Sequence, residues 1–92
     1  AVTEEKKNDY KERKERESTL RKLNGALKRC EQAIEDVEAK TAELAQQMSQ
    51  PEIATDYEKT SKLAEEIASL KEKEEALTAE WMELSEQIEA FT

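Results

Sequence analysis

Apolar residues recur along most of this chain at alternating steps of three and four, the spacing that places side chains on one face of an α-helix. There are two such series, one on either side of the single proline, Pro51. The first consists of Leu20, Leu23, Leu27, Cys30, Ile34, Val37, Thr41, Leu44 and Met48. The second consists of Thr60, Leu63, Ile67, Leu70, Glu74, Leu77, Trp81, Leu84, Ile88 and Phe91. The pattern predicts two long helices that pack on each other as a coiled coil.

The segment around Pro51 predicts a reversal of the chain, because a proline ring blocks the hydrogen bond that would continue a helix. Thr55 and Glu58 have the spacing of a capping box and suggest where the second helix starts. The fold class is therefore all-α, a two-helix antiparallel coiled-coil hairpin. The predicted boundaries are a flexible N-terminal linker over residues 1–8, a coiled-coil domain over 9–92, a first helix over about 9–49, a turn over 50–55 and a second helix over about 56–91.

One register pairs the two apolar series without a slip and gives a paired stem from Arg13 to Leu44. Its layers include Leu44 with Thr60, Val37 with Ile67, Ile34 with Leu70, Cys30 with Glu74, and Leu23 with Trp81. The charged pairs that it brings together are Glu31 with Lys71 and Lys40 with Glu66. Asn24-Gly25 could form a turn, but the unbroken stripe favours a continuous helix with Gly25 at an exposed position.

Composition argues against a catalytic or metal-binding role for this chain. With charged residues at 41% and hydrophobic residues at 36% of the sequence, an elongated rod is easier to stabilise than a compact domain. There is no His, one Cys and one Gly, so we expect no zinc site, no internal disulfide and no glycine-rich phosphate loop. Cys30 and Glu74 could form an activated pair, but a polar layer that sets the register is the preferred interpretation. We expect no enzyme activity, no catalytic or metal-binding residue and no cofactor in this chain.

The charge pattern also bears on location. The longest stretch without a charged residue runs from Leu44 to Pro51 and is eight residues long, too short to span a membrane. No signal peptide is visible. A cytoplasmic location with no membrane contact is the expectation.

Charge is distributed unevenly along the chain. Residues 1–30 hold ten basic and six acidic residues, whereas residues 31–92 hold five basic and seventeen acidic ones. In the heptad frame an outward stripe of basic side chains follows the first helix, with Gly25 in its middle, where a partner's backbone could approach closely. The stripe consists of Lys11, Lys14, Arg21, Lys22, Lys28 and Arg29. Such a stripe can neutralise nucleic-acid phosphates, although a solvated helix face would show the same residues.

Several short motifs resemble the C-terminal coiled-coil domain of bacterial ABC-F ATPases, the Uup-like proteins. They are Lys6-Lys7-Asn8-Asp9-Tyr10-Lys11-Glu12, Pro51-Glu52-Ile53, Asp56-Tyr57-Glu58-Lys59 and Trp81-Met82-Glu83-Leu84. The resemblance implies a parent protein with two ATP-binding cassettes, where ATP and Mg would bind outside this chain. It also implies action on the ribosome as a translation factor and nucleic-acid binding by this domain. By position, the N-terminal motif implies contacts from Lys6, Lys7, Tyr10 and Lys11.

We therefore expect a non-catalytic appendage that binds DNA or ribosomal RNA. A second hypothesis is a protein-interaction or oligomerisation rod, docking on its own cassettes or on a partner protein. Small residues beside the stripes could let two hairpins pair, although a monomer is favoured over a dimer; they are Ala26, Ala33, Ala45 and Ala64. A third, a tRNA-binding arm like that of seryl-tRNA synthetase, shares the architecture but has no supporting motif.

Overall fold

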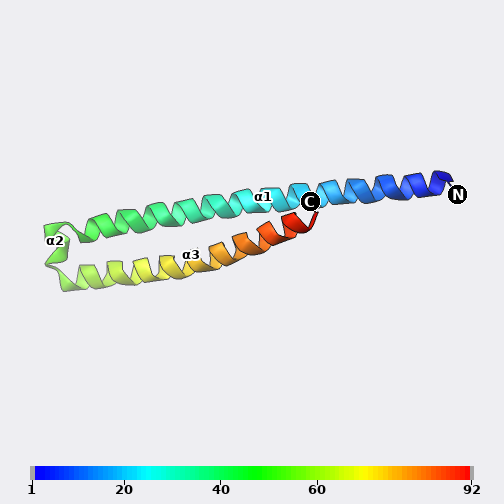
Figure 1. Cartoon of the computed structure of the whole chain (residues 1–92). Coiled ribbons are helices and arrows are strands. Elements are labelled where there is room, and N and C mark those ends of the chain that lie inside the picture. The colour runs from blue at the N-terminus through cyan, green and yellow to red at the C-terminus, as the bar shows by residue number, and fades with distance from the viewer. Residues whose placement is uncertain (1, 92) are drawn as a thin grey trace.

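The protein is a helical rod with its chain reversed near the middle. The computed structural model describes the backbone of residues 2–91 and the side chains of residues 9–91. Its elements are the long helix α1 (Val2–Met48), the short helix α2 (Pro51–Ala54) and the long helix α3 (Tyr57–Phe91). Helices α1 and α3 lie side by side in opposite directions, and α2 connects them at one end (Figure 1). The rod measures 79 × 16 × 14 Å. The predicted all-α antiparallel hairpin is confirmed.

The first helix begins earlier than the sequence suggested. Asp9 looked like a helix start, and residues 1–8 were expected to form a linker, but α1 begins at Val2. The segment contains no Gly or Pro that would interrupt a helix. The side chains of residues 1–8, including those of Lys6 and Lys7, lie outside the described residues.

The reversal contains a helical turn of its own rather than a plain loop. Pro51 occupies the first position of α2, where its missing N–H costs no hydrogen bond. The backbone N–H groups of Ile53 and Ala54 donate to the Gln50 carbonyl at 3.0 and 2.8 Å. The Thr55 N–H then donates to the Pro51 carbonyl at 3.3 Å, which closes the turn. The described backbone hydrogen bonds thus hold the reversal in a defined shape.

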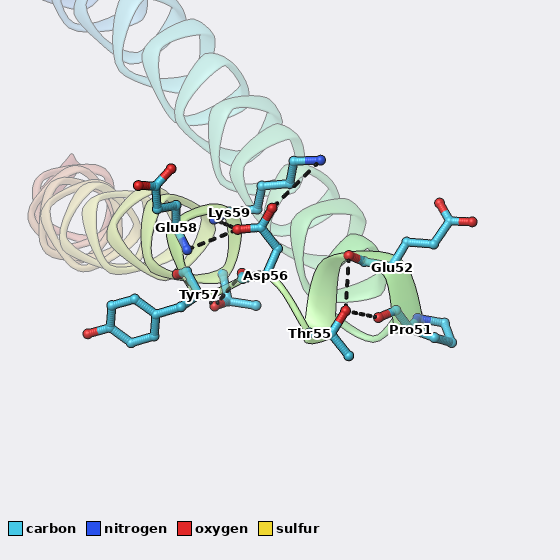
Figure 2. Close-up of polar contacts among 8 residues, drawn as sticks. Pro51, Glu52, Thr55, Asp56, Tyr57, Glu58 and Lys59 are labelled. Carbon is cyan, nitrogen blue, oxygen red and sulfur yellow. Dashed lines mark hydrogen bonds and ion pairs between the residues drawn. The ribbon is translucent and has the colours of Figure 1, made fainter.

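Helix α3 is capped by Asp56 rather than by Thr55. The Asp56 carboxylate accepts the backbone N–H groups of Glu58 at 3.1 Å and Lys59 at 3.3 Å (Figure 2). The Thr55 hydroxyl instead donates to the Pro51 carbonyl at 3.0 Å, because Thr55 closes α2. The predicted Thr55–Glu58 capping box is therefore wrong.

Replacing this cap gives a direct test of the turn. We expect Asp56→Ala to lower the free energy of unfolding by about 1 kcal/mol, because two backbone donors at the start of α3 lose their acceptor. Asp56→Asn retains an acceptor oxygen and should stay close to the wild type. Urea denaturation followed by circular dichroism measures both variants. Equal stability of Asp56→Ala and the wild type would contradict the assignment of the cap.

The core is a single line of side chains between α1 and α3. Every position of the two apolar series is buried or half-buried except Phe91, which is 37% exposed. The most deeply buried are Cys30, Val37 and Leu44, each with about a twentieth of its surface exposed or less. With only two helices, the side chains between them remain open to solvent along both edges of the interface, so few residues are completely buried. The heptad pattern of the sequence is confirmed at every position but Phe91.

The register of the two helices differs from the predicted one. The Cys30 thiol lies 3.1 Å from the Leu77 carbonyl, and the Trp81 indole N–H donates to the Glu31 carboxylate at 3.0 Å. In the predicted register Trp81 faces Leu23, which lies about 12 Å nearer the N-terminus of α1 than Glu31 does. These contacts place α3 about one heptad closer to the turn than predicted. Such a shift keeps the stripes facing each other, because both repeat with every heptad.

The other predicted pairs change accordingly. Leu44 shares a surface groove with Ser69 and Leu70, not with its predicted partner Thr60. The predicted pairing of Glu31 with Lys71 is replaced by the hydrogen bond to Trp81. Lys40 forms an ion pair with Glu43 on its own helix at 3.7 Å, although Lys40 and Glu66 do line one groove. Exposed pairs of this kind contribute at most about 1 kcal/mol, too little to hold the helices in the predicted register.

The shift leaves the N-terminal part of α1 without a neighbouring helix. Side chains 9–17 are all exposed, and the first half-buried residue is Ser18. Figure 1 shows α1 continuing well past the end of α3. The predicted stem beginning at Arg13 is therefore too long, and Arg13 and Arg16 do not extend the core. We call the described residues 9–17 the α1 extension.

Gly25 lies inside the continuous helix α1, as the stripe predicted, and no positive φ angle requires a glycine there. A β-carbon at this position would meet the Arg29 guanidinium at 3.5 Å, an ordinary van der Waals distance. We expect Gly25→Ala to raise the free energy of unfolding by about 1 kcal/mol, since alanine loses less backbone entropy in a helix. Urea denaturation measures the change. Destabilisation would show that α1 requires the glycine.

Candidate nucleic-acid interface

The strongest positive charge on the rod comes from one short segment of α1. Residues 18–30 include Arg21, Lys22, Lys28 and Arg29 and no acidic residue. All four basic side chains are exposed. A helix places Arg21 and Lys28 about 10 Å apart on one face, with Lys22 and Arg29 beside them. We call residues 18–30 the basic segment.

Gly25 does not provide the open backbone that the sequence suggested. The Arg29 guanidinium lies over it, and the glycine is half-buried. The arginine side chain would have to move before a partner's backbone could approach. The segment therefore presents charged side chains, rather than a bare stretch of backbone, at this position.

The remaining described candidates, Tyr10, Lys11 and Lys14, lie on the α1 extension and are exposed. The Lys14 ammonium sits over the ring of Tyr10, 5.9 Å from its centre, in a cation–π contact. Tyr10 and Lys14 line one depression together with Arg21. The structure thus places the described candidates in two neighbouring groups along one helix. Lys6 and Lys7 lie outside the described side chains.

Sequence reasoning missed Arg13 as a candidate. Arg13 lines a shallow depression of about 270 Å³ together with Tyr10, Lys14, Glu17 and Arg21. It was overlooked because the predicted register placed it against α3. Its position three residues after Tyr10 was the available signal, since residues three and four apart are neighbours on a helix surface.

The α1 extension and the basic segment differ in net charge. The extension carries four basic residues, Lys11, Arg13, Lys14 and Arg16, and four acidic ones, Asp9, Glu12, Glu15 and Glu17. Its charges therefore balance, whereas the basic segment has an excess of four positive charges. Non-specific attraction of a polyanion should be concentrated on the basic segment.

Helix α3 limits the direction from which a polyanion can approach. Its last turns carry Glu80, Glu83, Glu86 and Glu89, and Glu31 follows the basic segment on α1. These carboxylates repel phosphates at distances shorter than the screening length of about 8 Å in physiological salt. Phosphate contact is therefore favoured on the outer side of α1, away from α3.

The predicted layer of Cys30 with Glu74 is not found, because the shifted register places Cys30 against Leu77 instead. Cys30 is 4% exposed, and its thiol donates to the Leu77 carbonyl. Burial raises the pKa of the Cys30 thiol above its usual value, and the nearby Glu80 and Glu31 carboxylates raise it further. A thiol held in its neutral form is a poor nucleophile. Among the residues that the structure describes, no group of three His, Cys, Asp or Glu side chains could hold a metal ion.

Of the comparisons with known proteins, the one with family models gave a match. The family model of the ABC transporter C-terminal domain matches residues 7–86, which include most of both long helices, the turn and the basic segment. The chain belongs to this family. Neither the search of curated proteins nor the search of solved structures found a match. Within the described part of this C-terminal domain, no helix is both long and apolar enough to cross a membrane.

Proposed function

We propose that this C-terminal domain is a non-catalytic arm that binds the phosphates of DNA or ribosomal RNA through one side of α1. The observation that carries the proposal is the basic segment, where four exposed cations occur without a single carboxylate. The proposed contacts are Lys6, Lys7, Tyr10, Lys11, Lys14, Arg21, Lys22, Lys28 and Arg29, to which the geometry adds Arg13.

Electrostatics supports this function despite the chain's net charge of −8. Each phosphate that a cation neutralises releases condensed counterions, which favours binding at low salt. The acidic residues are concentrated beyond the basic segment, so they oppose binding along the whole rod more than binding at one end. The expected binding is independent of base sequence, because contacts to phosphates carry no sequence information.

The motif resemblance supports a parent protein of the Uup-like ABC-F type. In such a parent, which we place in the cytoplasm as a soluble translation factor, ATP and Mg would bind to the cassettes and not to this domain. The domain would then bring nucleic acid close to those cassettes, which would be its neighbours within the same protein.

Fluorescence anisotropy with a labelled DNA duplex and a labelled ribosomal RNA hairpin tests the proposal. The domain should bind at low salt, and the logarithm of the binding constant should fall by about 0.9 per phosphate contact for each tenfold increase in salt on duplex DNA. Undetectable binding to both probes at low salt would refute the function. A higher affinity for the RNA hairpin would assign the physiological target to RNA.

We also propose that the domain acts as a monomer. The large apolar side chains exposed on the described surface are Tyr10, Tyr57, Met82 and Phe91. They are spread over the α1 extension, the turn and the far half of α3 and form no continuous patch of the kind that stable dimers bury. Sedimentation equilibrium over micromolar concentrations should give a single monomeric species, and a concentration-dependent dimer would instead favour the oligomerisation hypothesis.

A further inference from the structure

The α1 extension and the first turn of the basic segment together combine an aromatic ring with three cations on one side of a single helix. Tyr10 is 67% exposed and lines the depression formed with Arg13, Lys14, Glu17 and Arg21. Tyr10, Lys14, Glu17 and Arg21 follow one another at steps of four, three and four, so they form one stripe about 16 Å long. The helix fixes the spacing of these groups before any ligand arrives.

This combination is the one that proteins use to bind unpaired nucleotides. An aromatic ring offers a flat surface on which any base can stack, and neighbouring cations hold the backbone phosphates. A base inside a duplex has both faces covered by its neighbours, so an exposed ring gains little from contact with duplex DNA. The Lys14 ammonium occupies one face of the Tyr10 ring, and the exposure of the side chain leaves room for a second contact.

The surroundings of Tyr10 favour a negatively charged ligand more than those of the other exposed tyrosine. Tyr57 is 84% exposed at the turn, but it lines a depression with Glu58, Lys62 and Glu65, where two carboxylates outnumber the one cation. Around Tyr10 three cations outnumber one carboxylate. Glu17 stands four residues from both Arg13 and Arg21, a spacing at which opposite charges attract and restrain each other on a helix.

The position on the extension also leaves the site accessible. Helix α3 ends before the N-terminal part of α1, so the last turns of α3 do not lie alongside that part of the helix (Figure 1). The depressions on the extension are lined by α1 residues alone. A single strand can therefore approach the ring without passing between two helices.

We propose that the Tyr10 depression binds an unpaired stretch of nucleic acid, with a base stacked on Tyr10 and phosphates held by Arg13, Lys14 and Arg21. This inference rests on the proposed nucleic-acid function and adds a ligand class to it. A duplex contacts the basic segment and the cations beside it, whereas an unpaired stretch also gains the stacking contact of Tyr10 in a depression that shares Lys14 and Arg21 with the duplex-binding face. The domain would then prefer a substrate in which single- and double-stranded regions adjoin.

The test compares tyrosine variants on two probes of equal length, a labelled single-stranded oligothymidylate and a labelled blunt DNA duplex, by anisotropy at low salt. Tyr10→Ala should weaken oligothymidylate binding about five- to tenfold, the effect of losing one stacked base at an exposed site. Duplex binding by Tyr10→Ala should fall by less than about twofold, because a paired base cannot stack on the ring and only a minor contact is lost. Tyr10→Phe retains the ring and should bind both probes normally, as should the matched control Tyr57→Ala.

Three results would overturn the inference. One is that Tyr10→Ala binds oligothymidylate as well as Tyr57→Ala does, and another is that it loses duplex and single-strand binding equally. The third is that the wild type binds the duplex but not oligothymidylate, which leaves the proposed function intact. Failure of the wild type to bind either probe would instead remove the function on which the inference rests. Circular dichroism of each variant checks that its helix content is unchanged. No change is expected, because the Tyr10 side chain is exposed on the surface of α1.

Discussion

Replacing Lys14, Arg21 and Lys28 together by glutamate is expected to reduce duplex DNA binding at low salt by at least about tenfold. Each lost phosphate contact should also lower the slope of log affinity against log salt by about one. The three side chains are exposed and stand at one heptad position, about 10 Å apart from one to the next. Reversal both removes three contacts and creates three sites of repulsion on the same face of α1.

A matched control separates position from net charge. Lys62, Lys71 and Lys73 are also exposed, but they lie on α3. Changing these three to glutamate alters the net charge of the domain by the same amount and leaves the basic segment intact. Binding by this control should remain within about threefold of the wild type. The three substituted positions lie beside the part of α1 that follows the basic segment, and salt screens most of their effect on phosphates bound to that segment. Equal losses in the two variants would mean that overall charge, and not the face of α1, governs binding.

Replacing Leu44 by alanine is expected to destabilise the domain by about 2–5 kcal/mol. Leu44 is one of the three most deeply buried residues. Because the core is only one side chain wide, no second layer of side chains can move in to fill the space that the leucine leaves. Since small domains are stable by only about 5–15 kcal/mol, the variant should lose a large part of its stability. Urea denaturation, followed by the ellipticity of the helices, gives the free energy of unfolding.

The exposed neighbour Gln46 provides the control for this experiment. Gln46→Ala also introduces alanine into the same turn of α1 but removes no core contact, and its effect should lie within about 0.5 kcal/mol of zero. If Leu44→Ala were no more destabilising than Gln46→Ala, α1 and α3 would not pack along the described seam.

The apolar stripes could be predicted from the sequence, but the register of the helices could not. The stripe from Leu20 to Met48 determines which face of α1 is buried, and that face is the one found. A stripe that repeats with every heptad matches its partner equally well after a slip of one heptad, so apolar spacing cannot choose between the two arrangements. The geometry of the turn selects one of them. Helix α2 occupies Pro51–Ala54, and Asp56 caps α3 directly after it. With this turn, Trp81 lies beside Glu31 rather than Leu23.

The candidate interface was predictable in part for the same reason. The basic residues on the outer face of α1 follow from heptad positions alone, and those within the described side chains are all exposed. What the sequence did not reveal depends on the register. Only the shift of α3 leaves Arg13 beside Tyr10 on a free helix, and only the three-dimensional structure places the Arg29 guanidinium over Gly25.

The central claim, that nucleic acid contacts one side of α1 near one end of the rod, is tested most directly by nuclear magnetic resonance. Backbone amide shifts of the labelled domain are followed during titration with a short DNA duplex at low salt. The account predicts shift changes concentrated over residues 10–29, with the turn at 51–59 and the acidic middle of α3 unaffected. Changes centred on the turn or on α3, or no change at all, would contradict it.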